Sequence, residues 1–213
     1  MSNPNILPIE RLGFDRRMTK EEINSLPIRA YEGKIKIVRT EAELDHALDE
    51  LKEENLLGFD TETRPNFKKG QNNKPSLIQL AGENTVYIFQ LQHLKFPVGL
   101  RELLANEKII KTGVAIDYDL MQLQRLGTFI EGGFAGLSRM AKNAGIKNHG
   151  LRGLAAVLLG FRISKGAQRS NWGNETLTRK QIIYAATDAW IGRDIFLRLQ
   201  EMGVIFRDLL FDD

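Results

Sequence analysis

Short apolar runs alternate with polar turns in the first half of the chain, and longer segments with helical periodicity dominate the second half. Apolar runs of four to eight residues bounded by turn residues are typical of β-strands, and apolar residues spaced three and four apart are typical of helices. The pattern predicts strands at 36–38, 56–63, 75–81, 86–89, 108–112 and near 129–134. It predicts helices at 41–54, 98–105, 115–126, 137–144, 151–160 and 178–201.

The lengths of the connections indicate how these strands pair. Strands 75–81 and 86–89 are joined by a tight turn, and a polar turn at 65–74 joins the first of them to strand 56–63, so these three strands should form an antiparallel meander. From residue 98 onward helices and strands alternate, which favours parallel crossovers. We therefore expect an α/β fold with a mixed sheet, strand 56–63 in its middle and helices flanking it.

Residues 1–34 show little periodicity apart from a capping box at Thr19 and Glu22, which predicts one short helix. We interpret this segment as an N-terminal extension packed onto a single domain at 35–213. A chain of 213 residues suits one domain with a substantial core.

Composition limits the chemistry. The chain has no cysteine, which excludes disulfides, thiolate catalysis and cysteine zinc sites and is compatible with a reducing cytoplasm, where we expect the protein. Its three histidines are far apart in sequence, so a metal would be held by carboxylates. No apolar run reaches about 18 residues and no secretory signal is readable at 1–11, so we expect no membrane partner.

The net charge of +3 does not by itself indicate a nucleic-acid partner, but the basic residues are unevenly placed. They gather at Lys142, Lys147, Arg152, Arg162, Lys165 and Arg169. A solvated face is the ordinary explanation for such a cluster. Proximity to an acidic site would favour phosphate binding instead.

Strand 56–63 carries two carboxylates, Asp60 and Glu62, separated by one residue. Side chains alternate along a strand, so both project from one face, where two like charges repel and raise each other's pKa. A divalent cation with a preference for oxygen ligands would relieve that repulsion. The alternative is an exposed strand end with two solvated carboxylates. Gly58 would let another backbone or a ligand approach this strand closely.

Two helices carry further acids at interior positions. On helix 115–126, Asp119 falls within the apolar arc, whereas Asp117 falls outside it. On helix 178–201, Tyr184 and Asp188 lie one turn apart, on a stripe that continues with apolar residues. A Tyr–Asp hydrogen bond within a core would explain the second pair alone. Four interior acids are better explained by one metal cluster than by four separate exceptions.

Segments 58–62, 113–119 and 184–189 resemble the three exonuclease motifs of the DnaQ-like DEDD superfamily. The tyrosine four residues before the last aspartate resembles that of the DEDDy branch. Segment 165–172 is similar to the stretch before the third motif in Werner-syndrome-type exonuclease domains and in the ribonuclease D group. The resemblance covers residues 36–201 approximately, and three motifs in order make it specific. One departure is Gly136, where many relatives carry an aspartate, and it affects helix capping only.

The resemblance implies an RNase H-like sheet and metal-dependent 3′–5′ exonuclease activity on the 3′ end of single-stranded DNA or RNA. It implies two ions, Mg²⁺ or Mn²⁺, that act on the attacking and leaving oxygens of a phosphodiester. The metal ligands would be Asp60, Glu62, Asp119 and Asp188. These four would be the catalytic residues together with Tyr184, which would orient the nucleophilic water because its usual pKa makes it a poor base.

Substrate contacts are predicted around the same site. Lys165 and Arg169 would meet phosphates, which positions a strand without reading its sequence. Thr61 points away from its two acidic neighbours, and its backbone would border the terminal nucleotide. Trp172 would stack on a base or anchor its loop, and we favour the anchor.

Three other functions compete with this interpretation. The first is a catalytically inactive nucleic-acid-binding module of the same fold, which has no reason to keep clustered acids near phosphate. The second is an endonuclease or nucleotidyltransferase on the same two-metal platform, which sequence separates poorly from an exonuclease. The third is a structural protein, which leaves the interior acids unexplained.

Overall fold

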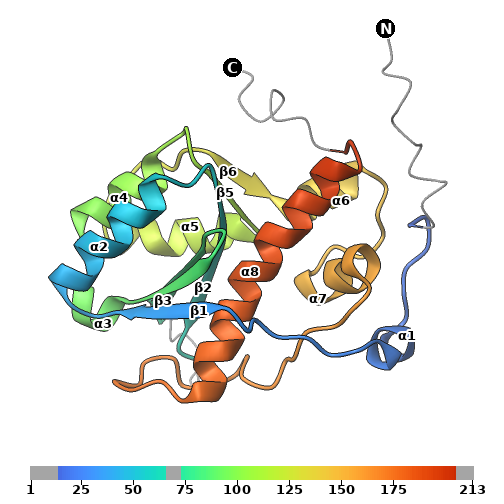
Figure 1. The fold of residues 1–213 in the computed structure, drawn as a ribbon, viewed down its shortest axis with the longest axis horizontal. Coiled ribbons are helices and arrows are strands. Elements are labelled where there is room, and N and C mark those ends of the chain that lie inside the picture. Colours follow the sequence, from blue (N-terminus) through green and yellow to red (C-terminus); the bar gives the residue numbers. More distant parts are fainter. Residues whose placement is uncertain (1–13, 66–72, 205–213) are drawn as a thin grey trace, which may run out of the picture.

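A six-stranded mixed sheet forms the centre of the computed structural model, which describes residues 14–65 and 73–204 (Figure 1). The strands are β1 (Lys34–Val38), β2 (Leu56–Thr63), β3 (Pro75–Ala81), β4 (Thr85–Gln90), β5 (Ile110–Gly113) and β6 (Phe134–Gly136). The helices are α1 (Lys20–Ser25), α2 (Glu41–Lys52), α3 (Leu91–Leu94), α4 (Val98–Ala105), α5 (Ile116–Gln124), α6 (Leu137–Asn143), α7 (Leu151–Leu154) and α8 (Arg179–Glu201). A π-helical segment, Ala155–Leu159, follows α7 directly.

The sheet has the predicted mixed topology, in the order β1-β4-β3-β2-β5-β6. Strands β2, β3 and β4 form the antiparallel meander, and β5 and β6 add in parallel beyond β2. Strand β2 is therefore an inner strand, paired on both sides. The first strand, β1, closes the opposite edge by pairing with β4 in parallel.

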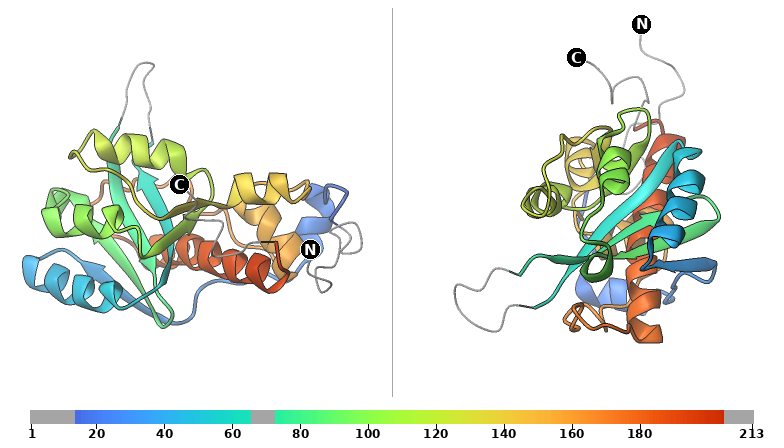
Figure 2. Two further views of the ribbon diagram at one scale, coloured as in Figure 1. Left: turned by 90° about the horizontal axis from the view of Figure 1, so that it is seen from above. Right: turned by 90° about the vertical axis from the view of Figure 1, so that its left-hand side faces the viewer.

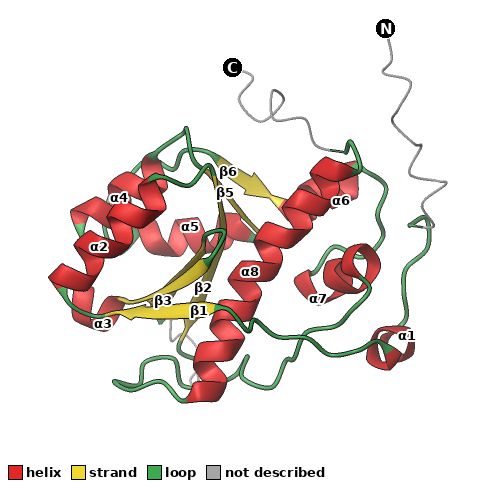
Figure 3. Cartoon of the chain, viewed as in Figure 1, coloured by secondary structure: helices red, strands yellow, loops and turns green. Residues whose placement is uncertain are grey.

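Helices cover both faces of the sheet (Figure 3). On one face α2, α4 and α5 pack through Leu48, Leu103 and Leu123 against Phe59 and Ile78 of the sheet. The two views of Figure 2 place α8 on the other side of β2 from α5.

The second face is covered by α8. Small residues of this helix, Ala185, Ala186 and Ala189, pack against Leu77 and Ile88 of the sheet. These short side chains let the helix axis lie close to the strands.

Glycine at position 58 permits the closest of these approaches. A Cβ added to Gly58 would lie 1.9 Å from the carbonyl oxygen of Ala189 and 3.1 Å from Cβ of Arg193. The backbone that approaches Gly58 is thus that of α8, in agreement with the expectation from sequence. No residue with a side chain fits at position 58 without displacing the helix.

The segment before β1 is docked on the domain. Its helix α1 begins with the predicted capping box, in which Thr19 Oγ1 accepts from the backbone N–H of Glu22 at 3.2 Å and Glu22 Oε2 accepts from that of Thr19 at 2.8 Å. Farther on, the backbone N–H of Arg29 donates to the carbonyl of Arg162, and the N–H of Arg162 donates to the carbonyl of Pro27.

Several predicted boundaries differ from those observed, most of them by one or two residues, and two of the differences have a clear cause in the backbone. The strand expected near 129–134 lies at 134–136. Gly133 has a left-handed backbone (φ 63°), which is not extended, so the strand begins after it, where Phe134 pairs with Lys111. The helix expected at 115–126 begins at Ile116, since Ala115 is itself left-handed (φ 60°) and acts as the N-cap. The short helix α3 has no counterpart among the predictions, and most of the predicted turn at 65–74 lies outside the described residues.

At Gly136 the departure from the family pattern has the expected local effect. This glycine is the N-cap of α6, and no side chain caps the helix there. Elsewhere, no helix of the described ranges combines the length and the apolar character needed to cross a bilayer.

The Gly58 contact generates a test of stability. Replacing Gly58 with alanine forces its Cβ against a backbone carbonyl that has no rotamer to change, so we expect the free energy of unfolding to fall by about 1–3 kcal/mol. Gly150→Ala is the matched control, because a Cβ there meets no atom within 4 Å and φ is −86°. Urea denaturation measures both, and equal stability of the two variants would contradict the role of Gly58.

Candidate active site

The acidic residues of β2 meet an acid from α8. Asp60, Glu62 and Asp188 each offer a carboxylate oxygen, and these three oxygens lie within 4.8 Å of one another. Glu62 is 9% exposed and Asp188 is 8% exposed. We call these three residues the carboxylate cluster.

The packing of α8 explains why the cluster forms. Asp60 and Glu62 share the face of β2 that carries Gly58, and Ala189 of α8 lies against that glycine. Asp188 is the neighbour of Ala189, so the same contact that fixes the helix brings its carboxylate over the strand. The close approach at Gly58 therefore positions the cluster.

Asp119, the fourth predicted acid, approaches from the other side. Its helix, α5, lies across β2 from α8, and the hydroxyl of Thr61 donates to Asp119 Oδ1 at 2.7 Å. Thr61 thus points away from Asp60 and Glu62, as strand alternation predicts, and it fixes the orientation of Asp119. Asp119 is half-buried, whereas Asp117 is exposed on the outer surface of α5.

Burial and mutual repulsion both disfavour ionisation of the cluster. The pKa of Asp60 is raised well above its usual value, first by burial and then by the charges of Asp188 and Asp119. Burial and the charge of Asp60 raise the pKa of Glu62. Burial also raises the pKa of Asp188, and hydrogen bonding with Tyr184 opposes that rise. Ionising all three carboxylates at neutral pH therefore requires a compensating positive charge.

Asp119 is perturbed less. Burial raises its pKa to about 6, and the hydrogen bond from Thr61 opposes the rise. Its smaller rise means that Asp119 ionises more readily than Glu62 does.

The donors available suit a hard divalent cation. Carboxylate oxygens are the ligands that Mg²⁺ and Mn²⁺ prefer, and Oδ1 of Asp188 is buried with no hydrogen-bond partner among the described residues. An orphaned buried oxygen is costly unless a ligand or water satisfies it. The residues present therefore fit a metal site.

Gln79 is a polar neighbour of this site that the sequence analysis missed. It lies opposite Asp60 in the β2–β3 register and is completely buried. Neither Oε1 nor Nε2 of its amide has a hydrogen-bond partner in the part of the chain that the structure describes. A glutamine within the apolar run 75–81 was the available signal.

Tyr184 lies beside the cluster with its ring held in the core. It is 9% exposed and packs against Trp172, with ring centroids 5.9 Å apart. Trp172 is fully buried, which confirms the prediction that it anchors its loop. Burial and the charges of Asp188 and Glu62 raise the pKa of the Tyr184 phenol, so the group stays protonated and acts as a hydrogen-bond donor.

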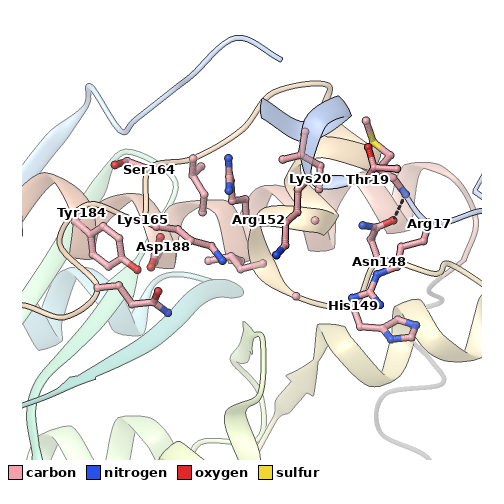
Figure 4. Close-up of a pocket in the computed structure, with 17 residues that line it drawn as sticks. Arg17, Thr19, Lys20, Asn148, His149, Arg152, Ser164, Lys165, Tyr184 and Asp188 are labelled. Atoms are coloured by element: carbon pink, nitrogen blue, oxygen red, sulfur yellow. Dashed lines mark hydrogen bonds between the residues drawn. The ribbon is translucent and has the colours of Figure 1, made fainter. Parts of the chain in front are cut away.

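A cavity of about 640 Å³ opens beside Tyr184 and Asp188, and Lys165 lines it (Figure 4). Lys165 therefore lies where the sequence analysis expects a phosphate contact. Arg169 is exposed and does not line this cavity.

The sequence matches the family model described as 3′–5′ exonuclease over residues 35–203. The chain belongs to this family. Its members include DnaQ-like exonucleases, and the six-stranded sheet of this chain has their RNase H-like fold.

Among curated relatives, this exonuclease domain is 35% identical over 164 residues to the bifunctional 3′–5′ exonuclease/ATP-dependent helicase WRN of Mus musculus. The match covers 72% of this chain and 11% of the relative, so the chain spans a small part of that protein.

Among solved structures, the Nibbler EXO domain of Aedes aegypti has a TM-score of 0.72 at 22% identity, covering 82% of this chain and 90% of that one. The RNase D of Trypanosoma brucei, in complex with RNA U12, has a TM-score of 0.67 at 20% identity, covering 85% and 64%.

The raised pKa values predict an unusual pH dependence in EDTA. The folded cluster binds protons more tightly than the unfolded chain does, so stability is greatest when the carboxyl groups are protonated and falls as pH rises. We expect the thermal midpoint to decrease from about pH 5 to about pH 9 in EDTA and to vary less with Mg²⁺ present.

Differential scanning fluorimetry measures this dependence. Asp188→Asn should reduce the pH slope, whereas Asp117→Asn, an exposed control on α5, should keep it. A midpoint that rises with pH in EDTA across this range would contradict the electrostatics of the cluster.

Proposed function

We propose that this domain removes nucleotides from the 3′ end of single-stranded nucleic acid by metal-dependent hydrolysis of phosphodiester bonds. The observation that carries the proposal is the buried carboxylate cluster within a chain of the 3′–5′ exonuclease family. Buried acids that repel one another destabilise the fold. Binding of a catalytic metal ion explains why they are present.

Four acids would hold the metal. Asp60, Glu62 and Asp188 would share one ion, and Asp119 would serve a second together with Asp60, which fits two Mg²⁺ or Mn²⁺ ions. Bound there, such ions would supply a nucleophile at neutral pH and stabilise the charge on the leaving oxygen. Thr61 would keep Asp119 turned toward that position through its 2.7 Å hydrogen bond.

Tyr184 supports assignment to the DEDDy branch. Its phenol stays protonated beside Asp188, so it would donate a hydrogen bond and orient the attacking water. A protonated phenol cannot accept the proton of that water. One of the carboxylates of the cluster would accept it instead.

Phosphate contacts would come from Lys165, which lines the cavity beside Asp188, and from Arg169, which is exposed four residues later. The backbone at Thr61 would border the terminal nucleotide. Both DNA and RNA remain candidate substrates, since the T. brucei neighbour is an RNase D in complex with RNA and the mouse relative is an exonuclease/helicase.

An inactive nucleic-acid-binding module is the main rival. Such a module would gain nothing from buried carboxylates close to phosphate, because they repel it. The intact cluster therefore favours the enzyme, and measured activity separates the two.

The first test follows cleavage of 5′-labelled single-stranded DNA and RNA with Mg²⁺, Mn²⁺ or EDTA. We expect a ladder that shortens from the 3′ end with either metal and disappears in EDTA. Asp60→Ala and Asp119→Ala should lose about 10³-fold or more in rate, whereas Asp117→Ala should match the wild type. Cleavage at internal positions would indicate an endonuclease, and binding without cleavage would indicate the inactive module.

Removing the phenol tests the role of Tyr184. In Tyr184→Phe the ring packing on Trp172 is kept while the hydroxyl is lost, so kcat should fall by about 10²-fold with KM nearly unchanged. Tyr118→Phe, an exposed control, should have no effect. A Tyr184→Phe enzyme as fast as the wild type would remove this tyrosine from the mechanism.

A further inference from the structure

The cavity beside the carboxylate cluster has a wall that lies outside the family match. The match begins at residue 35, yet Arg17, Met18, Thr19, Lys20 and Ile23 line the cavity together with Tyr184 and Asp188. We call residues 14–33 the extension. Part of the space next to the proposed active site is therefore formed by a segment that is not part of the matched domain.

Specific contacts hold the extension in this position. The backbone N–H of Met18 donates to Asn148 Oδ1 at 3.0 Å, and Arg152 donates to Asn24 Oδ1 at 2.5 Å. The backbone N–H of Tyr31 donates to Oγ1 of Thr187 at 3.0 Å. Because Thr187 is adjacent to Asp188 on α8, the extension is anchored directly to the helix that carries the cluster.

The cavity is strongly cationic. Arg17 and Lys20 from the extension and Arg152 and Lys165 from the domain all line it, and Asp188 is the one carboxylate among the described residues that do so. Such a concentration of positive charge beside an acidic cluster creates a local potential that attracts an anion.

None of these four cations has an ion-pair partner within 4 Å in the described ranges 14–65 and 73–204, and Nε of Arg152 is buried without any hydrogen-bond partner. Arg16 differs, since its guanidinium makes two hydrogen bonds to Glu22. The four cations that face the cavity are thus among those that no carboxylate of the described residues neutralises.

Figure 4 shows how these side chains are arranged. Tyr184 and Asp188 lie at one end of the cavity, and Arg17 lies near Asn148 and His149 at the other. Lys20 and Lys165 extend into the space between, from opposite walls. The positive charges therefore form a path that leads away from the proposed site of cleavage.

We propose that this cavity binds the phosphates of a nucleic-acid strand beyond the scissile bond, with Arg17 and Lys20 of the extension as phosphate contacts. The inference rests on the proposed function and extends it to residues outside the exonuclease domain. Lysine and arginine contacts of this kind hold a strand in register without reading its bases. The extension would therefore raise affinity for longer strands of any sequence.

A released nucleoside 5′-monophosphate presents the same chemistry, a phosphate among cations. The two ligands differ in how the contribution of Arg17 and Lys20 to binding depends on the length of the strand. A strand that follows the path uses Arg17 and Lys20 only when it is long enough to reach them, whereas a mononucleotide would use them regardless of substrate length.

The test compares Arg17→Ala/Lys20→Ala with Arg16→Ala/Lys34→Ala, which removes two charges from exposed residues that do not line the cavity. Fluorescence anisotropy in EDTA measures the binding of a labelled oligonucleotide of about ten nucleotides as salt varies. We expect the cavity variant to bind about tenfold more weakly, with a salt slope lower by about 1.4, and the control to bind as the wild type does.

A charge-conserving variant, Arg17→Lys/Lys20→Arg, serves as a second test in case the alanine variant unfolds. It should keep the wild-type affinity for the oligonucleotide and the wild-type salt slope. With Mg²⁺, the alanine variant should lower kcat/KM for the oligonucleotide and leave hydrolysis of thymidine 5′-monophosphate p-nitrophenyl ester unchanged.

Unchanged affinity and slope in the alanine variant would overturn the proposal. A matching loss of inhibition by a nucleoside 5′-monophosphate would overturn the strand assignment in favour of the released product. A wild type that binds with the expected salt slope but hydrolyses neither substrate would refute the exonuclease and leave the binding path standing.

Discussion

The contact between Gly58 and the carbonyl of Ala189 is the constraint on which this molecule depends. It sets the distance between an inner strand and the longest helix, and Asp188 is positioned by that distance. A Cβ at position 58 would clash with the carbonyl of Ala189, so a side chain there would push the helix, and Asp188 with it, away from the strand. The contact that packs α8 on β2 therefore also positions the carboxylate of Asp188, so a change in one alters the other.

The carboxylate cluster lies next to a cavity lined by lysine and arginine side chains. Burial raises the pKa of the carboxylates, and the cavity beside them is lined by cations that form no ion pair with any described residue. Neither set has a counter-ion among the described residues, and for the buried carboxylates this is costly. A metal ion at the acids and a phosphate chain along the cations would satisfy both sets together, so the electrostatics favour a ternary complex over the protein alone.

Sequence pattern predicted the sheet well because strands and connections are local features. Strand β2 has the predicted bounds, 56–63, and the helical wheel separated Asp119 from Asp117. The left-handed backbone of Ala115 and of Gly133 sets two element boundaries, and the pattern of apolar and polar residues did not predict it. The cavity wall was also missed, since it depends on a contact between segments more than a hundred residues apart.

Backbone groups pair the extension with the domain at residues 27–29 and 162. Main-chain hydrogen bonds do not depend on which side chains the residues carry, so the attachment at these positions tolerates substitution. Side chains at the cavity wall are thus free to diversify while the segment keeps its place. If the segment contacts phosphates as proposed, affinity for longer strands can change on it while the carboxylate cluster and its helix remain the same.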